Sequence, residues 1–310
     1  MQVEAELAKF SPGKDMLLTI GVFDGVHLGH RHLIAKLTGL ARQQGLASGV
    51  ITFNQHPNEV LAPQTRLPFL TDIERRIELL KDAGVEAVIS LSFTPELAAL
   101  SPTEFLGLLK KHLRMRGLVI GPDFALGRKR EGDTNVLHRL GEKMGFSLTV
   151  VPPRLISGEV ISSTAIRQAL AAGDMKRAQK LMGRPFRLHG QVVAGDKRGI
   201  KLGFPTANVD TDREQALPAD GVYTSRAYID DRAYSAMTNI GINPTFGGDQ
   251  RLVEVYIMGY DGNLYGRELA VDIIERLRGE IKFDNPEELK KQIAEDVKRG
   301  KAILEIRGAS

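Results

Sequence analysis

The first half of the chain alternates short apolar runs with segments whose apolar residues recur at helical spacing. Five runs have the length of buried parallel strands: residues 17–22, 48–53, 88–93, 118–121 and 148–151. Between the first two runs, five apolar residues share one face of a helix: Leu33, Ile34, Leu37, Leu40 and Ala41. This order makes a βαβ unit, for which a right-handed crossover is expected. We predict a doubly wound α/β sheet that binds its ligands beyond the carboxyl ends of its strands.

Polar residues mark the starts of two further helices. Thr71 and Glu74 form a capping-box pattern before an apolar helical run. Ser101 and Glu104 do the same for the next helix, with Pro102 in its first turn. A last helix of this half is expected at 135–144.

The second half changes its period. Two helical segments, 164–172 and 175–182, lead to Gly183, and beyond it apolar and polar residues alternate with a period near two. Five such segments predict strands: 188–194, 221–229, 233–240, 252–259 and 269–277. Residues 230–231 and 261–263 have the composition of hairpin turns. We predict a small antiparallel β-barrel followed by a helix at 286–302, and two domains that comprise residues 1–183 and 184–310.

Composition narrows the class of protein. Among the 310 residues, 42% are hydrophobic, the formal net charge is +4 and cysteine is absent, which excludes disulfides and thiolate metal sites. The mild positive charge favours anionic ligands such as ATP but is far from the basic footprint of a nucleic-acid binder. Residues 1–10 lack the apolar core of a signal peptide, and no run approaches the roughly 20 apolar residues of a membrane helix. We expect a cytoplasmic protein with neither nucleic-acid nor membrane partners.

The first chemical motif is the segment 21–30, GVFDGVHLGH, which joins the first strand to the first helix. Gly29 would let the backbone come close to a phosphate, and a helix N-terminus attracts anions. His27 and His30 could donate hydrogen bonds to a phosphate that gains charge during transfer. The segment therefore predicts a phosphate-transfer site at the strand-to-helix turn.

This segment resembles the HxGH signature of the nucleotidyltransferase superfamily, and its long form is similar to the branch that makes FAD. The resemblance implies adenylyl transfer, in which a substrate phosphate attacks the α-phosphate of ATP and pyrophosphate leaves, with His27 and His30 as catalytic residues. Catalysis of this kind rests on positioning and charge stabilisation. The implied ATP- and phosphate-binding residues are Gly21, Phe23, Asp24, Gly29, Ser162, Ser163, Thr164 and Arg167.

Three more segments resemble elements of that family in the same order: 52–57 (TFNQHP), 121–127 (GPDFALG) and 161–167 (ISSTAIR). In the third, hydroxyls could cap a helix, and Arg167 could neutralise the leaving pyrophosphate. The basic run 128–130 is interpreted as a solvated loop. Flavin binding by the adenylyltransferase is implied for Asn54, His56, Pro57, Asp123 and Phe124. The chain departs from the family pattern at Asn54-Gln55, where Asp-Pro is common, at Leu126, where Phe is usual, and at Ala165, where Arg is frequent.

The second motif is a glycine-rich loop, 195–203, followed by FPTAN at 204–208. It lacks the GK[ST] ending of a P-loop, and it resembles the GFPTAN element of riboflavin kinases. The resemblance implies that Thr206 and Asn208 help to hold the magnesium ion of Mg-ATP, for which oxygen ligands are suitable. ATP binding is implied for Gly195, Gly199, Gly203, Phe204 and Pro205. Ile200 stands where this loop often carries Arg.

Two further segments, 239–245 (NIGINPT) and 253–257 (VEVYI), resemble riboflavin kinase elements and imply that Glu254 is the general base for the ribityl hydroxyl. Together the motifs imply a bifunctional enzyme of the riboflavin kinase/FMN adenylyltransferase family. Riboflavin and ATP would give FMN and ADP, and FMN and ATP would give FAD and pyrophosphate.

Three alternatives stay open at this point. The first is a nucleotidyltransferase for another phosphorylated acceptor, such as a pantetheine or pyridine nucleotide compound, although the GFPTAN element with Glu254 would then have no purpose. The second is a non-enzymatic flavin or nucleic-acid binding module, against which the chain has no Trp and its barrel segment no dense basic stripe. The third is that only one half retains activity.

Overall fold

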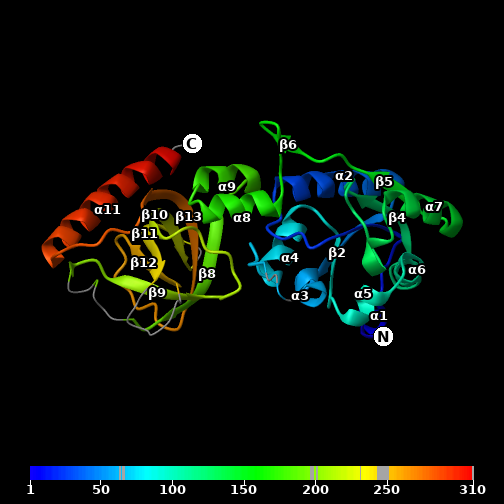
Figure 1. The fold of residues 1–310 in the computed structure, drawn as a ribbon, viewed down its shortest axis with the longest axis horizontal. Coiled ribbons are helices and arrows are strands. Elements are labelled where there is room, and N and C mark those ends of the chain that lie inside the picture. Colours follow the sequence, from blue (N-terminus) through cyan, green and yellow to red (C-terminus); the bar gives the residue numbers. More distant parts are fainter. Residues whose placement is uncertain are drawn as a thin grey trace. The chain divides into compact units, whose positions relative to one another are not determined.

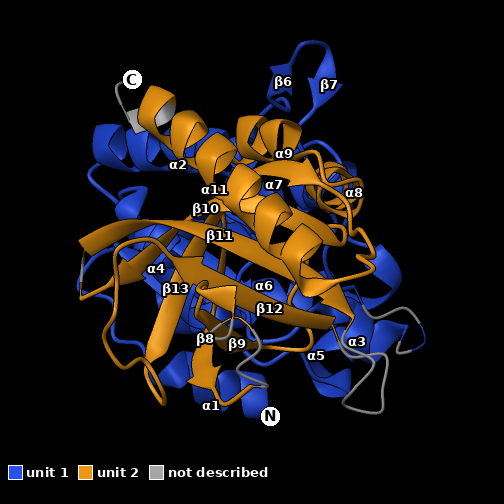
Figure 2. Ribbon diagram, turned by 90° about the vertical axis from the view of Figure 1, so that its left-hand side faces the viewer, with its two compact units in different colours: residues 1–163 blue, residues 164–310 orange. Residues whose placement is uncertain are grey.

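The computed structural model describes residues 1–62, 64, 67–195, 199, 202–230, 232–242 and 251–308 (Figure 1). It divides into two compact units, Met1–Ser163 and Thr164–Ser310 (Figure 2). The division falls before the predicted boundary at 183, because α9 (Met175–Met182) packs against strands of the second unit. The boundary between the functional domains, 183/184, stays a prediction.

The first unit is built on a parallel five-stranded sheet, as predicted. Its strand order is β3-β2-β1-β4-β5, so the order reverses direction between β1 and β4. The carboxyl edge beside such a reversal is where ligands of open α/β sheets bind. The strands are β1 (Met16–Ile20), β2 (Ala47–Phe53), β3 (Ala87–Leu91), β4 (Met115–Ile120) and β5 (Ser147–Val150).

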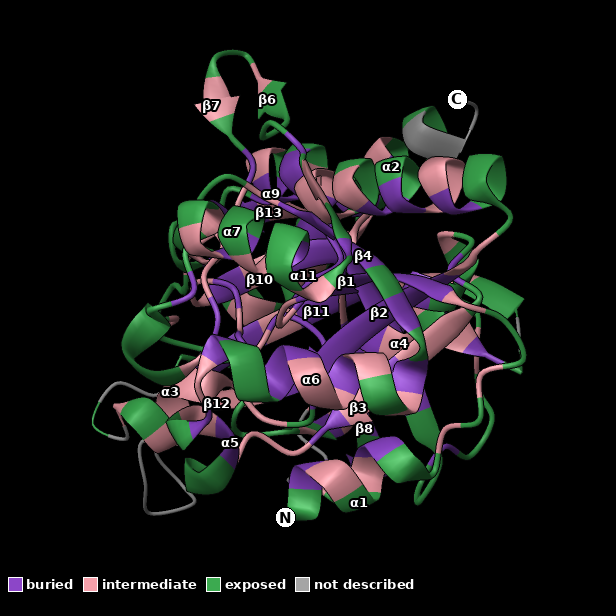
Figure 3. Ribbon diagram, turned by 90° about the vertical axis from the view of Figure 1, so that its right-hand side faces the viewer, coloured by how far each residue is buried: buried purple, intermediate pink, exposed green. Residues whose placement is uncertain are grey.

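Helices cover both faces of this sheet because its central strands are apolar on both sides. In β1, Leu18 belongs to one buried cluster with Leu109, whereas Leu17 belongs to another with Leu37. Figure 3 shows the buried strands between their helices and the exposed hairpin of β6 (Leu155–Ile156) and β7 (Glu159–Val160). The helices are α1 (Gln2–Ala8), α2 (Leu28–Gln44), α3 (Pro57–Leu61), α4 (Ile73–Asp82), α5 (Pro95–Ala99), α6 (Pro102–Leu113) and α7 (Thr134–Met144), with a 3-10 turn η1 (Arg128–Arg130).

One of the two predicted capping boxes is confirmed and the other is wrong. Ser101 caps α6, and Glu104 bonds back to the Ser101 amide. For α4 the cap is Asp72, whose carboxylate accepts from the Arg75 amide at 2.7 Å. Thr71 does not cap the helix, because its hydroxyl oxygen accepts a hydrogen bond from the Gly25 amide at 3.1 Å. Tertiary contact therefore outweighs the local pattern at Thr71.

The second unit is a closed antiparallel barrel with strand order β10-β11-β12-β9-β8-β13. All five predicted strands are present, and β9 (Thr206–Thr211) is an additional one that the sequence analysis missed. The other strands are β8 (Phe186–Val193), β10 (Gly221–Ile229), β11 (Arg232–Ile242), β12 (Arg251–Ile257) and β13 (Glu268–Arg278). Helices α8 (Ser163–Ala171) and α9 precede the barrel, and α11 (Pro286–Gly308) follows it.

Of the two predicted hairpin turns, one agrees with the strand register and one is wrong. Ile229 pairs with Arg232, which leaves two residues in the turn; Asp230 is left-handed at φ 48°, and Asp231 lies outside the described residues. The segment 261–263 does not form a hairpin, because β12 pairs with β11 and β9 whereas β13 pairs with β10 and β8. In the described part of the chain, no helix is both long and apolar enough to cross a membrane.

Candidate functional site

Three predicted site segments meet at one edge of the parallel sheet. Residues 21–30, which we call the histidine loop, follow β1, Asn54 follows β2, and Asp123 follows β4. These strands are neighbours in the order β2-β1-β4, and the Thr52 hydroxyl donates to the Val22 carbonyl oxygen at 2.9 Å. The sheet therefore gathers the predicted adenylyltransferase elements of the first unit at the edge where such folds bind ligands.

The histidine loop has an unusual backbone. Phe23 and Val26 have φ angles of 53° and 36°, in the left-handed region that side chains other than glycine seldom adopt. Between them Gly25 has φ 83°. Each such non-glycine residue costs on the order of 1–3 kcal/mol and persists only where surrounding contacts fix it. Phe23 and Val26 are both buried, so their packing helps to fix the loop.

Asp24 supplies the strongest of these contacts. Its carboxylate is 3% exposed and accepts hydrogen bonds from the amides of Leu70, at 2.9 Å, and Thr71, at 3.1 Å. The Arg76 guanidinium lies 3.9 Å from it. The carboxylate thus holds the loop against the segment that precedes α4. The predicted contact of Asp24 with ATP stays a prediction.

His27 and His30 lie together at the start of α2, as predicted. Their rings are stacked, with centroids 3.6 Å apart and planes at 15°. The Nδ1 atom of His27 caps the helix by accepting from the His30 amide at 3.2 Å, so a neutral His27 carries its hydrogen on Nε2. The edge of the Phe23 ring contacts His30 at a centroid distance of 5.1 Å. Two imidazoles at the N-terminus of a long helix make a site suited to an anionic group.

Gly29 stands at a close approach within the protein. A Cβ atom on this residue would lie 3.0 Å from the His27 ring and 3.0 Å from the Ile161 carbonyl oxygen. Two residues further along, the Ser163 hydroxyl donates to the Asp24 carbonyl oxygen at 2.9 Å. The segment 161–163 therefore supports the histidine loop directly. Thr164 and Arg167 follow in α8 and belong to the second compact unit.

The predicted flavin-binding residues of this unit have local partners. Asn54 hydrogen-bonds to the hydroxyls of Ser90 in β3 and of Ser92 just after that strand. His56 caps α3, whose first residue is Pro57. After β4, Asp123 is exposed and Phe124 packs partly against the core. Leu126 is buried in that core, so the substitution of Leu for the family's usual Phe changes core packing.

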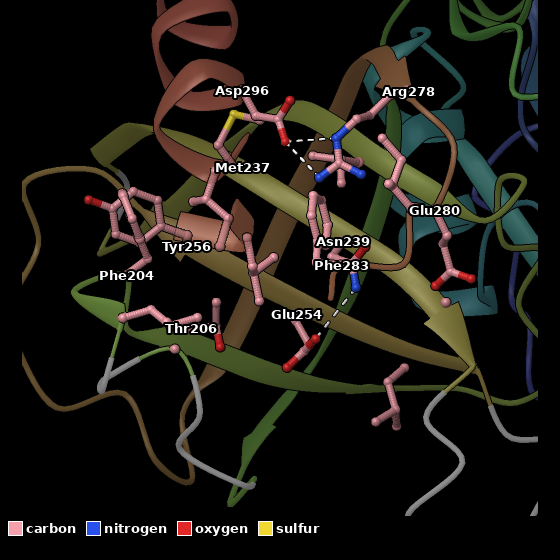
Figure 4. Close-up of a pocket in the computed structure, with 18 of the residues that line it drawn as sticks. Phe204, Thr206, Met237, Asn239, Glu254, Tyr256, Arg278, Glu280, Phe283 and Asp296 are labelled. Carbon is pink, nitrogen blue, oxygen red and sulfur yellow. Dashed lines mark hydrogen bonds and ion pairs between the residues drawn. The ribbon is translucent and has the colours of Figure 1, made fainter. Parts of the chain in front are cut away.

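The barrel encloses a cavity of about 720 Å³ (Figure 4). One side is polar and is formed by β9, β12 and β11, with Thr206, Asn208, Glu254 and Asn239. The other side is mainly apolar and is formed by the segment 281–283, by α11 and by Met237, with the side chains of Ile281, Phe283, Leu289, Ile293 and Val297. This division suits a ligand with a flat apolar part and a hydroxylated chain.

Glu254 lies in the middle of the polar side. In the strand register it stands between Asn239 of β11 and Asn208 of β9. The Asn239 amide nitrogen donates to the Glu254 carboxylate at 3.5 Å. A carboxylate so placed, with an amide donor to orient it, is able to accept a proton from a bound hydroxyl.

The described glycines of the predicted ATP loop serve close packing around the FPTAN segment. A Cβ on Gly195 would lie 2.0 Å from the Asn208 amide, and one on Gly199 would lie 2.3 Å from the Phe204 carbonyl oxygen. Gly203 has φ 85°, which favours glycine. Phe204 lines the cavity and meets Tyr256 edge-on at a centroid distance of 5.4 Å. Pro205 is exposed. The predicted residues Ile200, Lys201, Pro244 and Thr245 lie outside the described residues.

The sequence analysis did not assign several residues of this cavity to a site. Asn239 could have been found, since it begins the 239–245 segment that resembles a kinase element. Arg278 and Asp296 form an ion pair at the cavity wall, at 2.8 Å. The sequence does not indicate this pair, because a strand residue and a helix residue 18 positions apart have no fixed spatial relation.

Two family models match the chain. The model described as FAD synthetase matches residues 10–165, and the model described as riboflavin kinase matches residues 182–304. The bifunctional riboflavin kinase/FMN adenylyltransferase of Escherichia coli K12 is 38% identical over 288 residues, which is 92% of each chain. The protein of the same description from Listeria monocytogenes is 34% identical over 290 residues, covering 93% of this chain and 92% of that one.

A solved structure shares the whole fold. A crystal structure described as a macrolide-efflux protein from Streptococcus pneumoniae superposes with a TM-score of 0.89 at 32% sequence identity. The match covers 97% of each chain. An open parallel α/β sheet followed by a closed barrel is therefore an arrangement that this chain has in common with a solved protein.

Proposed function

The chain belongs to the family of bifunctional riboflavin kinases/FMN adenylyltransferases, which make FMN and FAD, and we propose that its two reactions are divided between the barrel cavity and the histidine loop. The observation that carries this division is that Glu254 and the His27/His30 pair lie in different compact units. Each has the surroundings that one of the two reactions requires.

In the barrel, riboflavin binds with its ring system against the apolar side of the cavity and its ribityl chain towards Glu254. Glu254 takes the proton of the terminal hydroxyl as that oxygen attacks the γ-phosphorus of ATP, so that FMN and ADP form. Asn239 orients the carboxylate. Because phosphoryl transfer has a loose transition state, positioning of the nucleophile matters more than the strength of the base.

Magnesium enters this site with ATP, in our proposal. Thr206 and Asn208 offer a hydroxyl and an amide oxygen at adjacent inward positions of β9, next to Glu254 in the register. Magnesium prefers oxygen ligands and keeps several waters and phosphate oxygens in its shell, so a small number of protein ligands is sufficient. The ion would neutralise charge on the phosphates, while Thr206 and Asn208 hold them near the hydroxyl.

In the first unit, the FMN phosphate attacks the α-phosphorus of a second ATP, and pyrophosphate leaves. His27 and His30 donate hydrogen bonds to the phosphate oxygens that gain charge. Ser162 and Ser163 hold the departing phosphates, and Gly21, Phe23 and Asp24 act through the shape of the loop. For Thr164 and Arg167 of α8, phosphate binding is proposed from the resemblance of the segment 161–167 alone. Asn54, His56, Pro57, Asp123 and Phe124 follow β2 and β4 at the same sheet edge, which supports a role in FMN binding.

The test is a chromatographic assay with two starting substrates, riboflavin and FMN, each with ATP and magnesium. Glu254→Gln should reduce formation of FMN by about 10²–10⁴-fold and leave the conversion of FMN to FAD intact. His30→Ala should do the reverse and accumulate FMN. Glu268→Gln and His32→Ala, which change exposed residues of the same types, are the matched controls. Loss of both reactions in either site variant would contradict the division, as would loss of neither.

The cytoplasmic location stays a prediction. It is supported by the bacterial relatives and by the requirement of both reactions for ATP. Fractionation of cells that express the full chain, followed by the two-substrate assay, would test it: activity is expected in the cytosolic fraction.

A further inference from the structure

The ion pair between Arg278 and Asp296 stands out because it is a charged pair in the apolar side of the cavity. Both side chains line the cavity, and they are only 17% and 8% exposed. Glu254, which carries the proposed proton transfer, lies on the opposite, polar side (Figure 4). The pair has therefore no part in the steps described above.

The hydrogen bonds of the pair fix the guanidinium in one orientation. Its Nε atom donates to one carboxylate oxygen of Asp296 at 2.9 Å, its Nη2 atom forms the ion pair with the same oxygen at 2.8 Å, and its Nη1 atom donates to the Gly279 carbonyl oxygen at 3.0 Å. The other oxygen of Asp296 accepts from the Gln292 amide at 3.1 Å. A guanidinium has five N–H groups. Within the described part of the chain, each of the two terminal nitrogens keeps at least one N–H group without an acceptor.

Asp296 lies on α11, and this helix is anchored to the barrel one turn after it. The Thr224 hydroxyl donates to the Gly300 carbonyl oxygen at 3.2 Å, and a Cβ on Gly300 would lie 2.5 Å from the Met237 sulfur, so α11 approaches the barrel closely there. Leu289 and Ile293, which cover the cavity, precede Asp296 on α11. Asp296 thus lies between Gly300, where the helix is anchored, and Leu289 and Ile293, which cover the cavity.

We propose that Asp296 is a positioning residue that aims the remaining N–H groups of Arg278 at the carbonyl-bearing edge of the riboflavin ring system. The proposal rests on riboflavin binding in the barrel cavity. An apolar wall holds a flat ring by contact area but does not select its orientation, whereas donors fixed in that wall do. Arg278 provides paired, planar donors, and Asp296 with Gln292 prevents the guanidinium from turning away.

The inference is tested by measuring riboflavin binding to the full-length protein without ATP, through quenching of riboflavin fluorescence. Asp296→Asn should weaken binding about tenfold, the range expected when a charge-assisted hydrogen bond is lost. It should raise the KM for riboflavin equally and leave kcat, the KM for ATP and the conversion of FMN to FAD within about twofold. Gln292→Ala, which keeps both charges paired, should weaken binding about threefold. Glu295→Gln removes a neighbouring exposed carboxylate and should change nothing.

The outcomes separate this inference from the proposed function. If the unaltered protein binds no riboflavin in the barrel, so that Glu254→Gln also leaves FMN formation unchanged, the proposed function fails and the inference with it. If the unaltered protein binds riboflavin and both Asp296→Asn and Gln292→Ala bind it equally well, only the inference is overturned. It is also overturned if kcat or the KM for ATP changes as much as the KM for riboflavin. Should Asp296→Asn not fold, Gln292→Ala decides.

Discussion

The histidine loop and the barrel cavity achieve a defined geometry in opposite ways. The loop is a continuous segment of ten residues with left-handed backbone angles. It is fixed by a bond from its Gly25 amide to the Thr71 hydroxyl and by bonds that its own Asp24 carboxylate accepts from the amides of Leu70 and Thr71. The cavity gathers side chains from five strands and a helix, and its shape follows from strand register and from the position of α11 against the barrel. A single lost anchor should therefore disable the loop, whereas the cavity should lose function by degrees.

The largest expected effect is that of Asp24→Ala. Removal of the carboxylate leaves the amides of Leu70 and Thr71 without their acceptor, which should reduce the unfolding free energy of the first unit by about 3 kcal/mol. Displacement of the histidines should slow conversion of FMN to FAD by about a hundredfold or more. Chemical unfolding followed by circular dichroism and the FMN assay measure the two effects. Asp82→Ala, at an exposed position of α4, is the control. Unchanged FAD formation would show that the anchors are redundant.

Gly29→Ala should come next. The new methyl group meets the His27 ring and the Ile161 carbonyl oxygen, so the pair of imidazoles must move. We expect FAD formation to fall by about ten- to a hundredfold and FMN formation to remain unchanged. Gly39→Ala lies on the same helix where an added Cβ meets nothing within 4 Å, and it should stabilise the protein by about 0.5–1 kcal/mol. Equal rates for the two variants would mean that the close approach at Gly29 is irrelevant to catalysis.

Gly300→Ala makes the corresponding change in the barrel and should have a smaller effect on rate. The methyl group would displace the flexible end of the Met237 side chain and crowd the Thr224 hydroxyl, which should cost about 1 kcal/mol of stability. All six tyrosines of the chain lie between residues 223 and 265, and there is no tryptophan, so tyrosine fluorescence reports unfolding of the second unit alone. The KM for riboflavin should rise a few-fold while kcat persists. A loss as complete as that of Asp24→Ala would remove the contrast between the two sites.

Tyr223→Phe should give the smallest effect: loss of about 1 kcal/mol at neutral pH, because the hydroxyl donates to the Ala219 carbonyl oxygen, and a changed response at high pH. Burial raises the pKa of Tyr223 in β10 to about 12, above the usual value of 10.0. Because the folded-state pKa is the higher one, the stabilisation is complete below about pH 10 and is lost as pH rises through about 12. Urea unfolding followed by circular dichroism across this range should show a decline in the parent protein and a shallower one in the variant. Identical slopes would assign the decline to other groups.

The motifs and the fold class could be read from the sequence because each depends on neighbours in the chain. The period of two predicted five strands of the barrel, and the apolar runs predicted all five strands of the parallel sheet. Strand β9 was missed because it begins inside the FPTAN motif, where Thr206, Asn208 and Asp210 replace the apolar residues that mark a strand. Its partners across the barrel, and not its own composition, make it a strand.

What the sequence could not predict depends on contacts between distant segments. The hydrogen bonds of the Asp24 carboxylate could not be predicted, because its partners lie 46 and 47 positions away. Thr71 completes a helix-capping pattern, yet it bonds to Gly25 instead. The turn predicted at 261–263 has suitable residues and fails because its flanking strands pair elsewhere in the barrel. For Thr71 and for the segment 261–263, the local pattern permitted two outcomes and the tertiary partner selected one.

Closure of the barrel has a consequence for how the protein would aggregate. Every strand of a closed sheet has both edges paired, so it offers no row of backbone donors and acceptors to another chain. The parallel sheet ends instead on β3 and β5. The edge at β3 is covered by α1. The Glu6 carboxylate of this helix accepts from the Ser92 amide, just beyond the strand, at 2.9 Å. Strand β5 has only four residues, and its Val150 is 39% exposed. Strand addition between damaged or partly unfolded molecules would therefore begin at β5, and its short length limits how far such pairing extends.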